Sequence, residues 1–400
     1  MLSSLKSSVL LSTTLSCLTL TLASPSSSSR GAVVHLRNES IPTFDNVVIF
    51  NPADADNYTD PEVLYARTAE LTLSGNVLLA TFENYSPEPP PVYFPIYRSA
   101  DHGLTWEHIA NVTDQANGWG NRYQPFLYEL PVDFGGYAAG TVLLAGNSIP
   151  SDLSSTQIDV YASTDAGYTW EFVSHVAAGG EAEPDNGVTP VWEPFLMIYE
   201  DQLVIYYSDQ RDAAHGQKLV HQTTTDLLTW TDPVDDVAYD EYTDRPGMTT
   251  VAQLPTGDYI MTYEWGHNFS GSYSFAVTYR ISASPLDFDS ADPVPLVAAN
   301  TGTEPKGSPY VVFSDAVGGV NGTIVVSCGG LSTVFTNSAL GDADEWYEYE
   351  TPEPTSYSRH LRVFAEDQTK LLIAGGGVLP PATDNAVTLS VVSIADLTEA

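Results

Sequence analysis

The sequence predicts an all-β fold, a six-bladed β-propeller. Six times a polar or charged residue leads into an apolar strand, a turn containing Gly or Asp, and a second apolar strand. Strand-built repeats of roughly 50 to 70 residues are typical of propeller blades, and helix-period patterns are almost absent. The six units begin at Tyr65, Tyr123, Trp192, Arg245, Ser308 and Tyr357.

A second repeat lies between these units. Residues 97–109 and 161–173 share the pattern Ser-x-Asp-x-Gly-x-Thr-Trp, and residues 221–233 hold a degenerate copy. The aspartate can accept backbone N–H bonds, the glycine allows positive φ, and the tryptophan can pack against the blade. These stretches resemble the Asp-boxes of sialidase-type propellers, so we expect structural turns without a catalytic role.

The two ends of the chain predict its domain organisation. Residues 1–23 carry one lysine and then an uncharged Leu-, Ser- and Thr-rich run, which is typical of a secretory signal peptide. We expect a Ser-rich lead-in over 24–40, one catalytic propeller domain over 41–400, and a secreted, extracellular protein. A strand at 46–50 is expected to pair beside a C-terminal strand within 387–397 and so close the ring.

The amino-acid composition limits the classes of molecule that the protein is expected to bind. The chain holds 51 Asp and Glu against 14 Lys and Arg, and such a surface repels nucleic acid and favours neutral substrates. After loss of Cys17 with the signal peptide, Cys328 has no internal disulfide partner. We expect a monomer that binds no membrane. No cluster of His or Cys has metal-ligand spacing, so no metal or cofactor is expected.

Six Asn-x-Ser/Thr sequons predict a glycoprotein. In a secreted chain such sequons mark exposed loops. They begin at Asn38, Asn57, Asn84, Asn111, Asn268 and Asn321.

Basic residues gather at the starts of the predicted blades. In a propeller the first strand of each blade lines the central channel, and five of the six starts carry a basic residue although the chain has few. We interpret these residues as part of a pocket; the alternative is that they pair with the abundant acids as structure. They are Arg67, Arg122, Arg245, Lys306 and Arg359.

Two glutamates are candidates for the chemistry. Glu193 heads the third blade between Trp192 and Pro194, where burial would raise its pKa, although a surface glutamate at a strand end is the plain alternative. Glu264 ends the second strand of the fourth blade. Two glutamates facing a sugar are what glycoside hydrolysis needs. Glu83 ends the second strand of the first blade in the same way and is a competing carboxylate.

Residues 122–131, 191–211, 261–266 and 355–364 resemble glycoside hydrolase family 93, secreted fungal exo-acting arabinanases on a six-bladed propeller. The resemblance implies release of arabinobiose from the non-reducing end of linear α-1,5-L-arabinan, a plant cell-wall polysaccharide, with retention of configuration. It implies that Glu193 and Glu264 are catalytic and that Tyr357 lies near the reacting sugar. With the blade starts and the aromatic platforms that sugars need, the substrate-binding candidates are Arg67, Trp119, Arg122, Tyr123, Gln124, Trp192, Arg245, Trp265 and Arg359.

The sequence leaves the two roles and two other functions open. We assign Glu264 as nucleophile and Glu193 as acid/base, because Glu193 should be the better desolvated; the reverse assignment stays open. An exo-sialidase is one alternative, since arginines and a tyrosine head several blades, but the acidic surface disfavours an anionic sugar. The other is a non-catalytic sugar-binding propeller.

Overall fold

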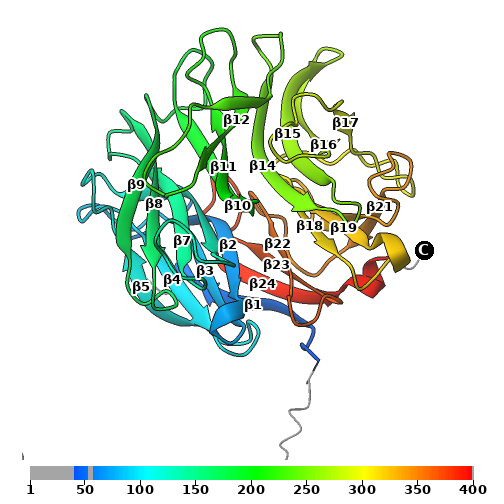
Figure 1. Cartoon of the computed structure of the whole chain (residues 1–400), viewed down its shortest axis with the longest axis horizontal. Helices are drawn as coiled ribbons and strands as arrows, with labels where there is room; N and C mark the ends of the chain where they lie inside the picture. Colours follow the sequence, from blue (N-terminus) through cyan, green and yellow to red (C-terminus); the bar gives the residue numbers. More distant parts are fainter. Residues whose placement is uncertain (1–39, 53–56, 399–400) are drawn as a thin grey trace, which may run out of the picture. The chain divides into compact units, whose positions relative to one another are not determined.

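The structure, a computed structural model, describes residues 40–52 and 57–398. Within them, strands β1 to β24 form six four-stranded antiparallel sheets. Figure 1 shows these sheets arranged as blades around a common centre. The predicted all-β, six-bladed propeller is therefore confirmed.

Each blade runs outward from a first strand near the centre. The first strands are β2 (Val63–Leu71), β6 (Asn121–Glu129), β10 (Val191–Tyr199), β14 (Arg245–Gln253), β18 (Tyr310–Ser314) and β22 (His360–Val363). The second strands are β3 (Val77–Asn84), β7 (Val142–Ser148), β11 (Gln202–Asp209), β15 (Tyr259–Phe269), β19 (Thr323–Ser327) and β23 (Lys370–Gly375). The third strands are β4 (Phe94–Ser99), β8 (Thr156–Ser163), β12 (Lys218–Thr224), β16 (Ser272–Ser282), β20 (Thr333–Asn337) and β24 (Val387–Ser393). The outermost strands are β5 (Glu107–Val112), β9 (Glu171–Gly179), β13 (Val234–Val237), β17 (Val294–Pro295), β21 (Tyr347–Glu350) and β1 (Phe44–Phe50).

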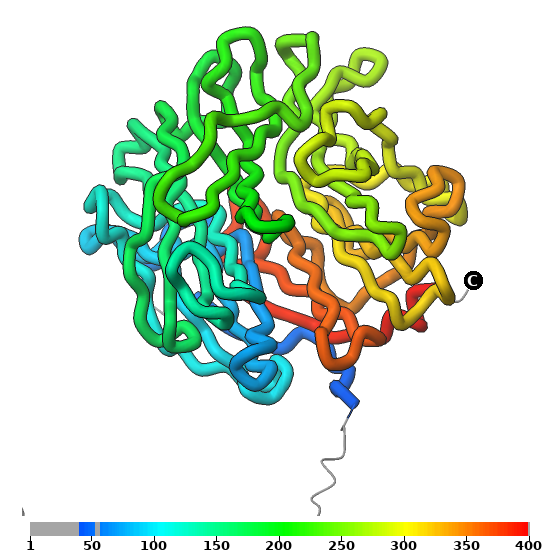
Figure 2. Tube along the Cα trace, viewed as in Figure 1, coloured from blue at the N-terminus to red at the C-terminus, as the bar shows by residue number. Residues whose placement is uncertain are grey.

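The ring closes by pairing the first strand of the chain with the last. Strand β1 lies antiparallel to β24, with Val47 opposite Leu389, and the Asn46 N–H donates to Ser390 Oγ at 2.9 Å. Figure 2 shows this blue segment beside the red one. The predicted pairing is confirmed, and it covers a strand edge that would otherwise be open.

The core lies between neighbouring blades. Strands β2 and β3 are buried along their whole length because each blade packs both faces against its neighbours. Phe126 and Phe195, on the first strands of blades two and three, have ring centroids 4.8 Å apart. Such aromatic contacts set the spacing of the first strands, and with it the geometry of the channel.

The Asp-box turns have the hydrogen bonds that their residues suggest. Asp165 accepts bonds from Thr169 N (2.8 Å), Thr169 Oγ1 (2.7 Å) and Ser163 Oγ (2.9 Å). Ser163 Oγ in turn accepts the Gly167 N–H, and Trp170 Nε1 donates to Gly167 O. The copy in the first blade repeats this geometry.

Blade five has a related turn whose residues do not match the Asp-box pattern. The Gly341 N–H donates to Asn337 Oδ1 at 2.9 Å, as glycine donates to serine in the Asp-box, and Trp346 follows fully buried. Asparagine replaces the serine, and no aspartate stands two residues later, so the sequence pattern does not match. The turn geometry is therefore more widespread than its motif.

We expect Asp165→Ala to lower the free energy of unfolding by about 1–3 kcal/mol, since three hydrogen bonds to the carboxylate are lost. Thermal and urea denaturation would measure it. Asp292→Ala is the matched control, because Asp292 is exposed and has no hydrogen-bonding partner within the described residues. Equal stability of the two variants would show that the turn contributes nothing.

Several expectations concern other parts of the chain. The signal peptide, nearly all of the lead-in, and Asn38 lie outside the described residues. Asn84 is buried at the end of β3, contrary to the expectation that every sequon marks an exposed loop. Cys328 is buried and unpaired. In the part of the chain that the structure describes, no helix is long and apolar enough to cross a membrane.

Candidate active site

The first strand of each blade is kinked at an equivalent place. Tyr65, Gln124, Glu193 and Met248 have φ of 53°, 57°, 63° and 57°, and the register against the second strand shifts around each of them. In blades five and six, the residues with positive φ lie two positions before the first strands; they are Ser308 and Ser358, with φ of 46° and 57°. Left-handed backbone is costly for non-glycine residues and persists where the surroundings hold it. The channel therefore has a repeated, strained bulge.

Four of these bulges are held by an oxygen from the preceding blade. In each case a side-chain carbonyl or carboxylate oxygen accepts the N–H of the residue with positive φ. The bonds are Gln124 N to Glu83 Oε1 (3.0 Å), Glu193 N to Gln124 Oε1 (3.1 Å), Met248 N to Glu193 Oε2 (2.8 Å) and Ser308 N to Glu264 Oε2 (2.7 Å). Both candidate catalytic glutamates thus also fix the backbone of the next blade.

A cavity of about 1060 Å³ lies on the side of the bulges. Its lining includes four glutamates, one aspartate, two cations and several aromatic rings. Among the lining residues are Glu83, Tyr85, Tyr123, Gln124, Trp192, Glu193, Gln217, Arg245, Glu264, Phe275, Lys306, Ser308 and Tyr357. A smaller cavity of about 300 Å³, along the far halves of β10, β14, β18 and β22, has no carboxylate in its lining. The chemistry therefore belongs to the larger one.

Glu193 is buried at the floor of the cavity. Its Oε2 accepts hydrogen bonds from Ser208 Oγ (2.7 Å) and the Met248 N–H (2.8 Å). Burial raises the pKa of Glu193, whereas these two donors and the charges of Arg245 and Arg67 oppose the rise. The site supplies this carboxylate with donors and cations that stabilise its charged form.

Glu264 accepts fewer hydrogen bonds than Glu193 does. It projects from the second strand of blade four, is partly exposed to the cavity, and accepts one backbone hydrogen bond, from Ser308. Burial, and then the negative charge of Glu193, raise the pKa of Glu264 to about 7. A group with this pKa holds a proton near neutrality and can deliver it.

Gly247 lies beside both carboxylates and against the Gln217 amide, whose Nε2 would be only 2.7 Å from a Cβ at this position. A Cβ on this glycine would lie 3.5 Å from Glu264 Oε1 and 3.6 Å from Glu193 Oε2, so the two oxygens are no farther apart than the sum of these distances. This upper limit includes the separation of roughly 5–5.5 Å found in retaining glycosidases and also the short end of the roughly 6.5–9.5 Å found in inverting ones. Glu193 and Glu264 therefore lie close together, next to Gly247 and the Gln217 amide.

Tyr357 and Glu83 complete this floor. Burial, followed by the charges of Glu193 and Glu264, raises the pKa of Tyr357 well above its usual range, so its phenol stays protonated. Glu83 is buried and accepts hydrogen bonds from Tyr85 Oη (2.8 Å) and the Gln124 N–H. Burial raises the pKa of Glu83 to about 7, against the effect of these donors.

Four predicted binding residues line the cavity. Tyr123 and Trp192 form an aromatic wall, with ring centroids 6.5 Å apart. Gln124 lies beside them. Arg245 is held by Gln217 Oε1 (2.8 Å) and by two other side-chain oxygens, which fix its guanidinium at the edge of the site.

Three other predicted binding residues are turned away from the cavity. Arg67 is buried, donates to Ser358 Oγ at 2.5 Å, and lies over the Tyr65 ring. Arg359 is fully buried and donates to carbonyls such as Thr333 O. Trp265 stacks on another aromatic ring and donates to a buried aspartate. The structure corrects these three predictions, because each side chain already has protein partners away from the lining.

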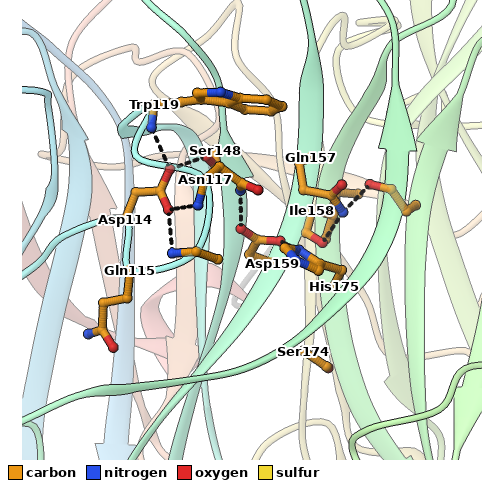
Figure 3. Close-up of polar contacts among 12 residues, drawn as sticks. Asp114, Gln115, Asn117, Trp119, Ser148, Gln157, Ile158, Asp159, Ser174 and His175 are labelled. Atoms are coloured by element: carbon orange, nitrogen blue, oxygen red, sulfur yellow. Dashed lines mark hydrogen bonds and ion pairs between the residues drawn. The ribbon is translucent and has the colours of Figure 1, made fainter.

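Trp119 and Arg122 also lie outside the lining. Figure 3 shows how Asp114 fixes the loop that carries Trp119: it accepts the Trp119 N–H at 2.8 Å and Ser148 Oγ at 2.6 Å. The Asn117 amide of the same loop donates to a buried aspartate of blade two. Arg122, on β6, pairs with Glu88 at 2.6 Å, which joins this strand to the loop after β3. That loop lines the cavity through Tyr85.

Several lining residues have no strong sequence signal. Tyr85, Gln217 and Phe275 lie on connections or outer strands, where no blade-start rule applies. Lys306 was recognised only as a blade start. Among residues 40–52 and 57–398, no group of three His, Cys, Asp or Glu is placed to hold a metal ion.

The raised carboxyl pKa values predict how stability depends on pH. A carboxyl with a pKa of about 7 in the folded protein and 4.5 when unfolded binds more protons folded than unfolded between these values. Stability contributed by Glu83 and Glu264 is therefore lost as pH rises through that window. We expect the melting temperature to fall from pH 5 to pH 8, and to fall by about 2–4 °C less in Glu264→Gln. Parallel curves for both proteins would contradict this.

Solved structures resemble the chain closely. An α-L-arabinofuranosidase from Fusarium graminearum, solved with an iminosugar inhibitor, is 57% identical, with a TM-score of 0.86 over 89% of this chain and 99% of that chain. The same organism's GH93 enzyme with arabinobiose matches equally in identity and TM-score, over 88% and 99%. A Penicillium chrysogenum α-L-arabinanase with arabinobiose is 52% identical, with a TM-score of 0.85 over 88% and 99%.

More distant matches show the fold alone. The NanB sialidase of Streptococcus pneumoniae is 10% identical, with a TM-score of 0.57 over 89% of this chain and 71% of that chain. No protein-family model and no curated protein matches the sequence. With identity above half across nearly the full length of the Fusarium and Penicillium proteins, the chain belongs to glycoside hydrolase family 93.

Proposed function

We propose that this protein is a secreted exo-glycosidase that releases arabinobiose from the non-reducing end of linear α-1,5-L-arabinan with retention of configuration. The observation that carries the proposal is the pair of carboxylates beside Gly247, where a Cβ would lie 3.5 Å from Glu264 Oε1 and 3.6 Å from Glu193 Oε2. Relatives more than half identical have been solved with arabinobiose bound. The strongly acidic composition agrees with a neutral polysaccharide as substrate.

We assign Glu193 as nucleophile and Glu264 as acid/base, the reverse of the assignment favoured from sequence. Burial raises the pKa of Glu193, and two hydrogen-bond donors and nearby arginines oppose that rise by stabilising the charged form. Glu264 has one donor and a pKa of about 7, and it lies farther out, on a second strand, where a leaving group would depart. The ionised acid attacks and the protonated acid gives its proton, as glycoside hydrolysis requires.

The reaction then has two balanced steps. A Glu193 oxygen attacks the anomeric carbon, the bond from that carbon to the leaving oxygen breaks, and the Glu264 proton passes to that oxygen. Water next attacks the same carbon, its proton passes to Glu264, and the bond to Glu193 breaks. Two displacements at one carbon retain its configuration.

Tyr357 supports this reading over the sialidase alternative. Its pKa is raised well above the usual range by burial and by the two glutamates, so the phenolate needed for nucleophilic attack is disfavoured. We assign it to hydrogen bonding near the sugar. A strong preference for a sialic-acid substrate over arabinan would favour the alternative.

Product analysis on linear arabinan tests the function. We expect arabinobiose as the sole early product, from a substrate whose non-reducing end is free. A ladder of longer oligomers would indicate an endo-acting enzyme. Sugar binding without any turnover would indicate a non-catalytic lectin.

Secretion is a separate part of the proposal, based on residues 1–23. Expression of the full chain in a fungal host, followed by N-terminal sequencing of protein from the medium, would test it. We expect a mature terminus close to Ser24 and a protein that runs as a monomer in size-exclusion chromatography.

A further inference from the structure

Glu83 occupies the same position in blade one as Glu264 does in blade four. In the strand register Glu83 lies opposite Leu64, just before the bulge of β2, and Glu264 lies opposite Gly247, just before the bulge of β14. Each also accepts the N–H of the bulge residue of the following blade. Among the further carboxylates of the cavity, Glu83 is therefore the one that has the same register position and the same backbone hydrogen bond as Glu264.

Two differences separate Glu83 from a reacting group. Glu264 lies opposite a glycine, Gly247, whereas Glu83 lies opposite the buried side chain of Leu64. Both Glu83 oxygens already accept hydrogen bonds, Oε1 from Gln124 N and Oε2 from Tyr85 Oη. By contrast, Glu264 Oε1 accepts no hydrogen bond from any residue that the structure describes. Both carboxylate oxygens of Glu83 are thus occupied by hydrogen bonds within the protein.

The hydrogen bonds of Glu83 lead through Gln124 to Glu193. Glu83 Oε1 holds the backbone N–H of Gln124, and Gln124 Oε1 holds the backbone N–H of Glu193 at its φ of 63°. Asn147 Nδ2 donates to the same Gln124 oxygen at 2.9 Å and keeps that amide oriented. All members of this series of hydrogen bonds are buried, so a lost bond would leave a buried polar group without its protein partner.

We propose that Glu83 is a positioning residue: through Gln124 it sets the strained backbone at Glu193, and so the place of the attacking carboxylate. This inference rests on the proposed function, because its effect is read in the reaction. A misplacement of about 1 Å can cost roughly 10²-fold in rate. The loss should therefore appear in kcat more than in KM.

Four variants of the full chain test it with linear arabinan. Glu83→Gln puts an NH2 group where one of the two donors now binds. Gln124→Asn tolerates the left-handed backbone but is too short to reach the Glu193 N–H. The third variant combines both. Glu70→Gln is the matched control, because Glu70 is a buried acid on β2 that accepts an N–H from blade six, at Ala365, and lines neither cavity.

We expect Glu83→Gln and Gln124→Asn each to lower kcat by about 10- to 100-fold, with KM within about threefold of the wild type. The kcat of the double variant should be no lower than that of the more severe single variant, since the two residues act through one series of hydrogen bonds. Glu70→Gln should lower the melting temperature and leave kcat unchanged. Circular dichroism and melting curves establish that each variant is folded; if Glu83→Gln is not, Gln124→Asn carries the test.

Three outcomes would overturn the proposal: a kcat of Glu83→Gln like that of Glu70→Gln, losses that multiply in the double variant, or a loss as deep as that of Glu193→Ala. The last would make Glu83 a reacting group. A wild type that releases no arabinobiose would refute the proposed function instead. An active wild type with an unimpaired Glu83→Gln would refute only the positioning role.

Discussion

Glu193→Ala is expected to lower kcat on linear arabinan by roughly 10⁴-fold or more, the scale seen when a group that forms a bond to substrate is removed. The truncated side chain leaves a space beside the anomeric carbon and frees the Met248 N–H and Ser208 hydroxyl. Added azide can enter that space and attack in place of the carboxylate. We therefore expect azide to restore turnover and to give a glycosyl azide of inverted configuration.

The stereochemistry of that product decides between the two roles. One displacement by azide, with no glycosyl-enzyme, inverts the anomeric carbon. A glycosyl azide of retained configuration from Glu193→Ala would mean that azide had attacked a covalent intermediate on another residue. Glu193 would then be the acid/base, as the sequence argument first had it. Glu193→Gln is the matched variant, since it fills the space and should gain nothing from azide.

Glu264→Ala should lower kcat by about 10²- to 10⁴-fold on arabinan, the usual contribution of a general acid. An aryl glycoside with a good leaving group needs no proton to depart, so its first step should be much less impaired. Azide should then accelerate release of the glycosyl-enzyme and give a product of retained configuration.

Leaving-group dependence is the sharper measurement for this residue. We expect kcat/KM of Glu264→Ala to rise steeply as the leaving-group pKa falls, while the wild type shows a shallow dependence. In the wild type, kcat/KM should also fall above a pH of about 7, as Glu264 loses its proton. Equal loss on good and poor leaving groups would exclude Glu264 as the acid.

The blades themselves could be predicted because their signals are local. Alternating apolar strands, tight turns and Asp-box spacing each span a few residues, so the sequence shows them directly. Closure by β1 and β24 followed from the need to cover open edges. The turn at Asn337 was missed because different residues make the same hydrogen bonds there.

The site was predicted only in part because a bulge changes which side chains face the channel. One extra residue in a strand reverses the faces of all that follow, and the sequence does not show where the extra residue lies. Arg67, two residues beyond the kink at Tyr65, consequently points into the protein. Trp265 could have been excluded, since strand alternation turns the neighbour of a cavity-facing Glu264 away from the cavity.

Pairing of β1 with β24 also has a consequence for how the chain is made. The segment 44–50 is synthesised before every other strand that the structure describes, and its partner, 387–393, after all of them. Earlier blades can fold as they emerge, but the ring cannot close until this last strand has been made. A nascent chain stalled before the final blade would leave this segment without its partner, and chaperones would have reason to bind it.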